Sequence, residues 1–328
     1  MHSFIKTIRR RARNSHKRIV FTEGLDERVL RATEKIMKKK IADIILLGPP
    51  RKIKEKAKKL KLKIDWKKIK IIDPLTSKLS VPYAKTLFEL REEKGLTLAQ
   101  SKKLLKDENY FGTMMVYTNS ADGMITGAAH ETADSIRPAL QIIKTKEAFH
   151  KASGIYFMVL EKRLLLFADT AITIDPNSHD LADIAMDTAQ TAKKFGITPK
   201  IALLSFSTKS SVKNTSADKI REAVGLIKNK MPDLTVDGEL QVDAALVPEV
   251  AKRKCPDSPI KGDANILIFP NLESANIGYK LVERLARATA IGPFLQGLKK
   301  PINDLSRGCN YKDIVNAAAF TACECEVD

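Results

Sequence analysis

Residues Arg18–Leu47 read RIVFTEGLDERVLRATEKIMKKKIADIILL and contain one strand–helix–strand unit. The first six residues and Ile41–Leu47 are apolar runs of strand length, whereas Asp26–Lys39 repeats its apolar residues at helical spacing. A helix between two buried strands usually carries the chain to a parallel neighbour. We therefore expect these residues to begin a parallel sheet.

The same alternation continues toward residue 145. Further elements are expected at Arg51–Leu62 (helix), Ile69–Ile72 (strand), Tyr83–Lys94 (helix), Ala121–Thr126 (strand) and Ser135–Thr145 (helix). This βαβαβα order predicts an α/β domain with a mainly parallel sheet that helices cover on both faces.

A different pattern begins at Ile155. Two apolar runs, Ile155–Leu160 and Leu164–Phe167, flank a short charged turn and predict a hairpin at the start of a second domain. Beyond it we expect helices at Leu181–Phe195, Ala217–Lys230 and Ser274–Ala288, and strands at Lys200–Phe206 and Ile266–Phe269. A chain of 328 residues is long enough for two cores. The sequence thus predicts two α/β domains, the second with a mixed sheet, and a ligand cleft between them.

Charge and cysteine content narrow the functional classes. The formal net charge of +18 favours anionic partners, but few aromatic residues lie among the basic ones, so nucleic acid is disfavoured. Basic residues gather in Met1–Arg18 and in Arg51–Lys70, where lysines alternate with Ile and Leu. In the first tract an amphipathic helix with Phe4, Ile5 and Ile8 on one face is preferred to a transit peptide or nucleic-acid arm. No apolar run is long enough to span a membrane. The four cysteines form no metal-binding spacing, which favours free thiols in a reducing cytoplasm.

Several catalytic motifs are absent from the sequence. It has no dinucleotide-binding G-x-G-x-x-G after a strand, no P-loop, no G-x-S-x-G and no H-E-x-x-H. Common nucleotide-binding, hydrolase and zinc-protease motifs therefore do not account for the function. Ligand-binding residues must be sought in the loops that follow the predicted strands.

The first candidate segment is ADGMITGAAHETADSIRP, residues Ala121–Pro138. Small residues after the strand let a ligand approach the backbone, and Thr126 and His130 lie among them. The guanidinium of Arg137 suits a phosphate or carboxylate. The structural alternative is a plain strand–turn–helix joint with a polar helix cap.

Two further segments have the features of anion loops. In KIALLSFSTKSS, residues Lys200–Ser211, a strand runs into a hydroxyl-rich turn that contains Ser207. In ILIFPNLESANIGY, residues Ile266–Tyr279, a helix begins after Asn271 and presents free N–H groups. The alternatives are an ordinary polar loop in the first case and Ser274 as a plain helix cap in the second.

The fourth segment is KKPINDLSRGCNYKD, residues Lys299–Asp313, which leads into an Ala-rich helix over Ile314–Cys323. Ser306 and Arg307 precede the helix, so a hydroxyl, a guanidinium and backbone donors converge there. Asp313 is either a catalytic carboxylate or the third helical residue of a capping box that begins at Asn310. The sequence pattern is the same in both cases.

Together and in this order, these segments resemble the phosphate acetyltransferase (phosphotransacetylase) family. The matching strings are ADGMITGAAHETADSIRPALQIIKT, KIALLSFSTKSS, DGELQVDAALVPEVA, NILIFPNLESANIGYKL and PINDLSRGCNYKDIV. The resemblance extends from about Arg18 to about Ala322. It implies reversible acetyl transfer between acetyl phosphate and coenzyme A, with inorganic phosphate as the other substrate, and it implies a homodimer with neither a tightly bound cofactor nor a metal. It also implies a domain I of residues 1–143 plus 298–328 and a dimer-forming domain II of residues 144–297.

The resemblance assigns roles to individual residues. Asp313 matches the general base that takes the proton of the coenzyme A thiol, since the thiolate is the nucleophile. Ser306 matches the serine that stabilises the thiolate or the developing oxyanion, and Arg307 the arginine that holds the acyl phosphate during direct transfer in a ternary complex. Contacts with coenzyme A or phosphate are expected at Arg91, Arg137, Thr126, His130, Ser207, Asn271 and Asn276.

Some positions depart from the family pattern. Ala275 and Asn271 stand where the family usually has Gly and Asp, Thr126 where Ser is frequent, and Arg287 in a stretch that usually has smaller residues. Substrate fit is expected to depend on these loops. Two alternatives therefore accompany the main interpretation: an acyltransferase similar to the phosphate butyryltransferases, and a non-catalytic regulatory module that binds acetyl-CoA.

Overall fold

The computed structural model describes residues 2–130, 132–146 and 151–326. The chain forms two compact units. We call His2–Lys144 with Leu298–Asp328 the terminal unit, and Thr145–Gly297 the central unit. The closing segment of the chain thus belongs to the same unit as the opening one.

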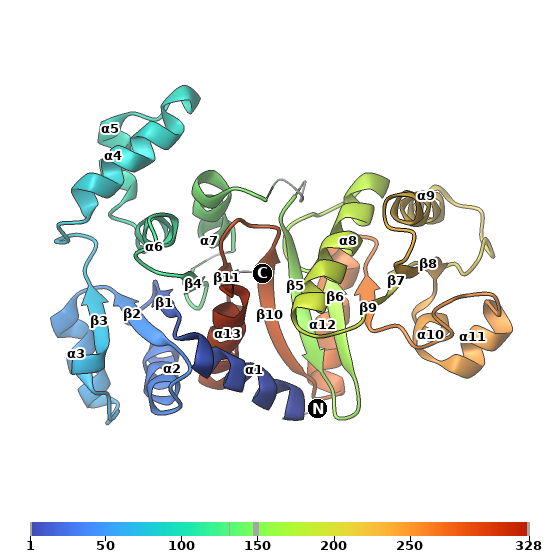
Figure 1. Ribbon diagram of the computed structural model, residues 1–328, viewed down its shortest axis with the longest axis horizontal. Helices are drawn as coiled ribbons and strands as arrows, with labels where there is room; N and C mark the ends of the chain where they lie inside the picture. Colours follow the sequence, from blue (N-terminus) through green and yellow to red (C-terminus); the bar gives the residue numbers. More distant parts are fainter. Residues whose placement is uncertain (1, 131, 147–150, 327–328) are drawn as a thin grey trace. The chain divides into compact units, whose positions relative to one another are not determined.

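The terminal unit is built on a parallel sheet (Figure 1). Its strands lie in the order β3-β2-β1-β4-β11, and every neighbouring pair runs parallel. The strands are β1 (Arg18–Phe21), β2 (Asp43–Leu47), β3 (Ile69–Ile72), β4 (Gly123–Thr126) and β11 (Ile302–Asp304). The parallel sheet predicted for the first domain is confirmed.

Helices cover both faces of this sheet, as predicted. α6 packs on β1 and β4 from one face, and α13 contacts the same two strands from the other (Figure 1). The helices are α1 (His2–Ser15), α2 (Glu27–Lys38), α3 (Pro50–Lys59), α4 (Ser80–Arg91), α5 (Leu98–Leu104), α6 (Glu108–Tyr117), α7 (Thr132–Pro138) and α13 (Tyr311–Glu324), with 3₁₀ turns at Trp66–Lys68 and Glu92–Lys94.

The basic start of the chain forms the expected amphipathic helix. Ile8 and Ala12 of α1 are buried, and the Phe4 ring lies 5.9 Å from that of Phe320 in α13, edge to face. α1 also packs along α13 as a whole. The apolar face of α1 therefore completes the core of the terminal unit, and most of its basic side chains point to solvent.

One predicted helix has different bounds and a different form. We expected a helix over Ser135–Thr145, but α7 begins at Thr132, and the chain continues after it as a π-helical turn over Ala139–Ile143. Pro138 has no N–H with which to continue an α-helical ladder, and Lys144 ends the turn at φ 61°. Propensity alone does not reveal such a turn.

The central unit has a mixed sheet, also as predicted. Its strands lie in the order β10-β5-β6-β9-β7-β8, with β5 antiparallel to both neighbours and the remaining pairs parallel. The expected hairpin is β5 with β6. The elements are β5 (Ser153–Val159), β6 (Leu164–Ala168), α8 (Ser178–Lys194), β7 (Lys200–Leu204), α9 (Thr215–Lys230), β8 (Thr235–Leu240), α10 (Val242–Leu246), α11 (Pro248–Lys254), β9 (Ile266–Ile268), α12 (Leu272–Leu285) and β10 (Thr289–Gln296).

Alternate residues of β5 face opposite layers of the central unit. Tyr156 stacks on Tyr279 of α12 at 4.3 Å between ring centroids, whereas Phe157 meets Phe195, at the end of α8, at 5.0 Å. Since side chains alternate across a strand, α12 and α8 cover opposite faces of the sheet. Among the residues described, no helix has the length and hydropathy that crossing a bilayer requires.

Candidate active site

Three loops of the terminal unit meet at the carboxyl edge of its sheet, because β1, β4 and β11 run parallel and adjacent. Gly127, in the loop after β4, has φ 89°, and a Cβ there would collide with Asp304 and lie 2.7 Å from the backbone nitrogen of Leu305. Only glycine fits this approach. The loop after β4 and the loop after β11 are therefore pressed together.

Arg28, in the first turn of α2, joins these two loops. Its guanidinium donates to the carbonyls of Arg307 (2.7 Å) and Cys309 (3.3 Å) in one loop and to that of Ala128 in the other. Asp26, the N-cap of α2, pairs with the same guanidinium at 2.8 Å. The start of α2 thus fixes the position of both loops.

Glu23, two residues beyond β1, organises the loop after β4. Its carboxylate accepts hydrogen bonds from the backbone N–H groups of Ala128 (2.7 Å), Ala129 (2.6 Å) and His130 (3.0 Å), and it lies 2.8 Å from Nδ1 of His130. Burial favours a higher pKa for Glu23, but these donors outweigh burial and lower the pKa. The same contact raises the pKa of His130, so Glu23 favours the protonated imidazole.

The segment that contains the three predicted catalytic residues links β11 to α13. Ser306 is half-buried, Arg307 is exposed, and the Ser306 Oγ accepts a hydrogen bond from the backbone N–H of Gly308 at 3.3 Å. Asn310 caps α13, and the Asp313 carboxylate accepts the N–H of Asn310 at 2.8 Å. The capping box is therefore formed, and Asp313 is held at the start of α13 with its side chain half-buried.

Two cavities adjoin this edge of the terminal unit, and His130 lines both. One, of about 370 Å³, lies at the ends of β1 and β2 and also touches Glu23 and Gly48. The other, of about 480 Å³, is lined by residues of α5, α6 and α7, among them Tyr110 and Arg137. Both are of a size that suits parts of a small-molecule ligand.

Arg91 and Arg137 act on one group in the second cavity. Burial raises the pKa of the Tyr110 phenol, while the charges of Arg137 and Arg91 both lower it. Arg137 is exposed and lies 3.8 Å from Asp134, one turn earlier in α7. Arg137 lines this cavity together with Tyr110, and the charge of Arg91, far away in the sequence, acts on the same phenol.

Thr126 and Ser207 are buried rather than exposed. Thr126 is 1% exposed, and its hydroxyl donates to Asn109 at 2.6 Å and accepts from Thr22 at 2.9 Å. Ser207, in the central unit, is 0% exposed and donates to Glu239 at 2.8 Å. Both hydroxyls thus hold their own loops in place.

Asn271 and Asn276 lie at the start of α12 in the central unit. Asn271 is the N-cap, and its side chain accepts the N–H of Ser274 at 2.9 Å, whereas Asn276 is half-buried in the following turn. Ala275 between them is fully buried. Arg287, beyond the end of α12, has φ 53°, a conformation that favours glycine.

Sequence reasoning did not single out Glu23, Arg28 or Tyr110. Glu23 directly follows the RIVFT run, and a carboxylate at the end of a parallel strand is a usable signal. Arg28 looks like an ordinary first-turn residue of an amphipathic helix, so no signal in the sequence marks its contacts. Within the described chain, no group of three His, Cys, Asp or Glu residues is arranged to hold a metal ion.

Comparisons with known proteins agree with this architecture. Residues 3–322 match the family model described as "Phosphate acetyl/butaryl transferase". A phosphate acetyltransferase of Bacillus subtilis is 49% identical over 324 residues, which cover 99% of each chain. The solved structure of a phosphotransacetylase from Streptococcus pyogenes has a TM-score of 0.92 at 46% identity, covering 99% of this chain and 98% of its own. That of a phosphotransacetylase from Staphylococcus aureus has a TM-score of 0.89 at 43% identity, covering 99% of both chains. The chain belongs to the phosphate acetyl/butyryl transferase family.

Proposed function

We propose that this protein is a phosphate acetyltransferase that transfers acetyl reversibly between acetyl phosphate and coenzyme A. The relatives at 43–49% identity that match nearly the whole chain are named for this activity. The observation that supports the proposal most strongly is the segment from Ser306 to Asp313, which follows β11, the parallel neighbour of β4, at the carboxyl edge of the sheet.

In the proposed mechanism the Asp313 carboxylate removes the proton of the coenzyme A thiol. A free thiol has a pKa of about 8.5, so little of it is ionised at neutral pH without a base. The thiolate attacks the carbonyl carbon of acetyl phosphate, the carbon–sulfur bond forms, and the bond to the phosphate oxygen breaks. Arg307 offsets the charge of the departing phosphate, and the Ser306 hydroxyl donates to the thiolate or the developing oxyanion.

Coenzyme A and phosphate are proposed to bind through the remaining predicted residues. Arg91 and Arg137, both near the Tyr110 phenol, are suited to the phosphates of coenzyme A. His130 lines both cavities, and its imidazole is proposed to donate a hydrogen bond to a phosphate while Glu23 holds Nδ1. Asn271 and Asn276 are proposed to contact phosphate at the start of α12. The buried hydroxyls of Thr126 and Ser207 act by holding their loops.

The assembly and location follow from other features. We propose a homodimer that forms through α12, since Ile277, Leu281 and Leu285 lie at four-residue spacing and are 59%, 52% and 80% exposed. We propose a cytoplasmic location, because coenzyme A and acetyl phosphate are metabolites of that compartment and the four cysteines are free thiols. Catalysis in this scheme requires no metal and no bound cofactor.

The assay that tests the proposal is thioester formation from acetyl phosphate and coenzyme A. Asp313→Asn keeps an acceptor oxygen for the Asn310 N–H, so the capping box survives, but it removes the base. We expect kcat to fall by about 10²–10⁴-fold in this variant. Asp313→Ala, which removes both cap and base, should lose the same activity and also stability.

The matched control is Asp180→Asn in α8. Asp180 forms the same capping box with Asn177 but lies outside the proposed active site. Its substitution should leave kcat unchanged. Full activity of Asp313→Asn would mean that Asp313 only caps α13 and is not the base. Preferential turnover of butyryl phosphate over acetyl phosphate would instead identify the protein as a phosphate butyryltransferase.

A further inference from the structure

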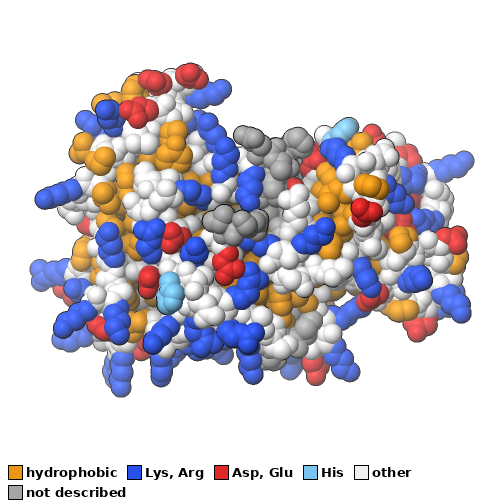
Figure 2. All heavy atoms as spheres, in the orientation of Figure 1, with side chains coloured by type: hydrophobic (Ala, Val, Ile, Leu, Met, Phe, Trp, Pro, Cys, Tyr) orange, Lys and Arg blue, Asp and Glu red, His pale blue; other side chains and the backbone are white. Residues whose placement is uncertain are grey.

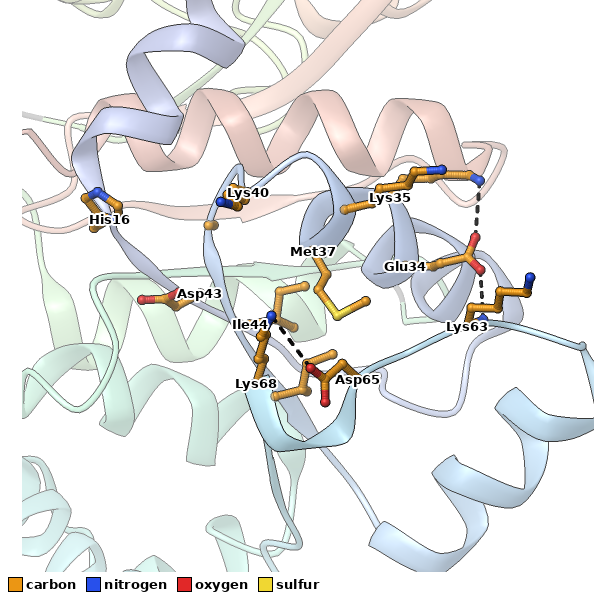
Figure 3. A pocket seen from close by; sticks show the side chains of 13 residues that line it. His16, Glu34, Lys35, Met37, Lys40, Asp43, Ile44, Lys63, Asp65 and Lys68 are labelled. Atoms are coloured by element: carbon orange, nitrogen blue, oxygen red, sulfur yellow. Dashed lines mark hydrogen bonds and ion pairs between the residues drawn. The ribbon is translucent and has the colours of Figure 1, made fainter.

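A cavity of about 690 Å³ lies at the opposite end of the terminal unit's sheet from the candidate active site (Figure 3). Asp43 and Ile44, at the start of β2, and Ile69, at the start of β3, form part of its wall. Gly48, just beyond the other end of β2, lines a cavity of the candidate active site instead. The two cavities therefore lie at opposite ends of β2.

The floor of this cavity is apolar. Ile44 and Ile69 are 3% and 7% exposed, and Ala42 lies beside them. Figure 3 shows the Met37 side chain projecting from α2 toward the segment of Asp65 and Lys68. A flat apolar group of a ligand would contact this floor.

The rim is rich in cations. Five lysines and a histidine line the cavity, against three carboxylates: Lys35, Lys38, Lys40, Lys63, Lys68 and His16, with Glu34, Asp43 and Asp65. Figure 2 shows that basic side chains gather over α1, α2 and α3, the helices of this part of the terminal unit. The cavity is therefore a hollow within a basic surface.

Two of the three carboxylates already have partners. Glu34 accepts the backbone N–H of Lys63 at 2.8 Å and pairs with Lys35 at 3.1 Å. Asp65 caps the following 3₁₀ turn and lies 3.6 Å from Lys68. In contrast, no ion pair within the described residues involves the ammonium groups of Lys38, Lys40 or Lys63. Asp43 is the one remaining carboxylate of the rim, and it is exposed.

Helix stabilisation does not account for these lysines as a group. The dipole of α2 favours cations in its last turn, which explains Lys35 and Lys38. It does not explain Lys63 and Lys68, which come from the segment before β3, or Lys40, which lies beyond the end of α2. Positive charge is also crowded here, since burial and then the charges of Arg9, Lys35 and Arg13 lower the pKa of Lys39.

We propose that this cavity binds a nucleotide, with its phosphates held by Lys38, Lys40 and Lys63 and its base on the floor formed by Met37 and Ile44. The volume falls in the range of small-molecule sites, and unpaired ammonium groups above an apolar floor match a ligand with an anionic and a flat apolar part. The site is separate from the one proposed for coenzyme A. Its ligand contacts the last turn of α2, the helix whose first turn holds the active-site loops through Arg28.

The test is calorimetric titration of ATP into the full chain and into its Arg91→Ala/Arg137→Ala variant, in which the proposed coenzyme A site is weakened but the cavity is unchanged. ATP should bind to both proteins, and more tightly than tripolyphosphate, which lacks the base. Lys40→Glu/Lys63→Glu should weaken ATP binding by at least about tenfold, because it removes two charge-assisted contacts. An unchanged unfolding temperature will show that the variant is folded.

The matched control is Lys228→Glu/Lys252→Glu, two exposed lysines of the central unit, which changes the net charge by the same amount. It should leave the affinity for ATP within about twofold, as expected for surface charges remote from a site. An equal loss in the control would show that only net charge matters and would overturn the proposal. So would loss of ATP binding in Arg91→Ala/Arg137→Ala, failure of ATP to bind at millimolar concentration, or equal affinity for ATP and tripolyphosphate.

Discussion

At the residue scale, Asp187 in α8 is a carboxyl group that the described residues bury without full hydrogen bonding. It is 3% exposed, and among the described residues its Oδ2 has no hydrogen-bond partner. Burial, followed by the nearby charge of Asp183, raises its pKa to about 8. The folded protein therefore keeps a proton there that the unfolded chain releases near pH 4.

The pH dependence of stability follows from this difference. Between about pH 4 and pH 8, Asp187 is protonated in the folded state but ionised in the unfolded state. The free energy of unfolding therefore decreases as pH rises. Asp187→Asn removes the effect, and we expect it to raise the free energy of unfolding at pH 8 by a few kcal/mol, on the order of 1.4 kcal/mol per pH unit crossed. Near pH 4 the variant and the parent should be equal.

Chemical denaturation at pH 5, 6.5 and 8 measures this difference. The control is Asp183→Asn on the same helix, whose carboxylate lies 3.5 Å from Lys230 and should not give the same gain at high pH. A constant difference between Asp187→Asn and the parent across the range would show that Asp187 is ionised in the folded state, contrary to our expectation.

At the element scale, α1 attaches the basic N-terminal stretch to the core of the terminal unit. Ile8 is 1% exposed and the thiol of Cys323 in α13 lies 3.5 Å from its carbonyl oxygen. Ile8→Ala should lower the free energy of unfolding by about 2–5 kcal/mol, since it leaves a cavity between α1 and α13. Arg10→Ala on the exposed face should change it by less than about 0.5 kcal/mol. If thermal unfolding showed equally small losses of stability for Ile8→Ala and Arg10→Ala, α1 would not contribute to the core.

The strands and helices that sequence analysis missed have no regular spacing of apolar residues. β10 reads TAIGPFLQ, and Gly292–Pro293 interrupts it, while β8 reads TVDGEL and carries two acidic residues that the fold buries. α6 is buried along most of its length, so its apolar residues follow no single stripe. The apolar strands β1, β2 and β3 were predicted because each is a short, continuous run between turn residues.

At the scale of the whole molecule, the proposed dimer can be tested through α12. Leu281→Lys/Leu285→Lys places two charges on its exposed face, and we expect the mass in sedimentation to fall from twice to once the 36.5 kDa of the chain. Val81→Lys changes an exposed apolar residue of α4 in the terminal unit and should leave the dimer intact. An unchanged mass of the α12 variant would place the interface elsewhere, and a single-chain mass of the parent protein would exclude the dimer.

The candidate site was predictable in its loops but not in its contacts. The segments after β4 and β11 carry polar residues in a recognisable order, so Ser306, Arg307 and Arg137 were singled out from sequence. Pairing of Glu23 with the loop after β4 joins positions 105 residues or more apart. Such contacts depend on which strands become neighbours in the sheet. The spacing of apolar residues along the chain does not predict the strand order.

The return of the last segment to the terminal unit has a consequence for synthesis on the ribosome. β11 lies beside β4 in the sheet, and α13 packs on α1 and α2, so the terminal unit lacks a strand and a core helix until residues 302–324 have been synthesised. The central unit, in contrast, is continuous in sequence from Thr145 to Gly297 and has all its strands before β11 is made. Vectorial folding would therefore complete the central unit first and leave residues 2–144 exposed to chaperones until β11 and α13 emerge from the ribosome.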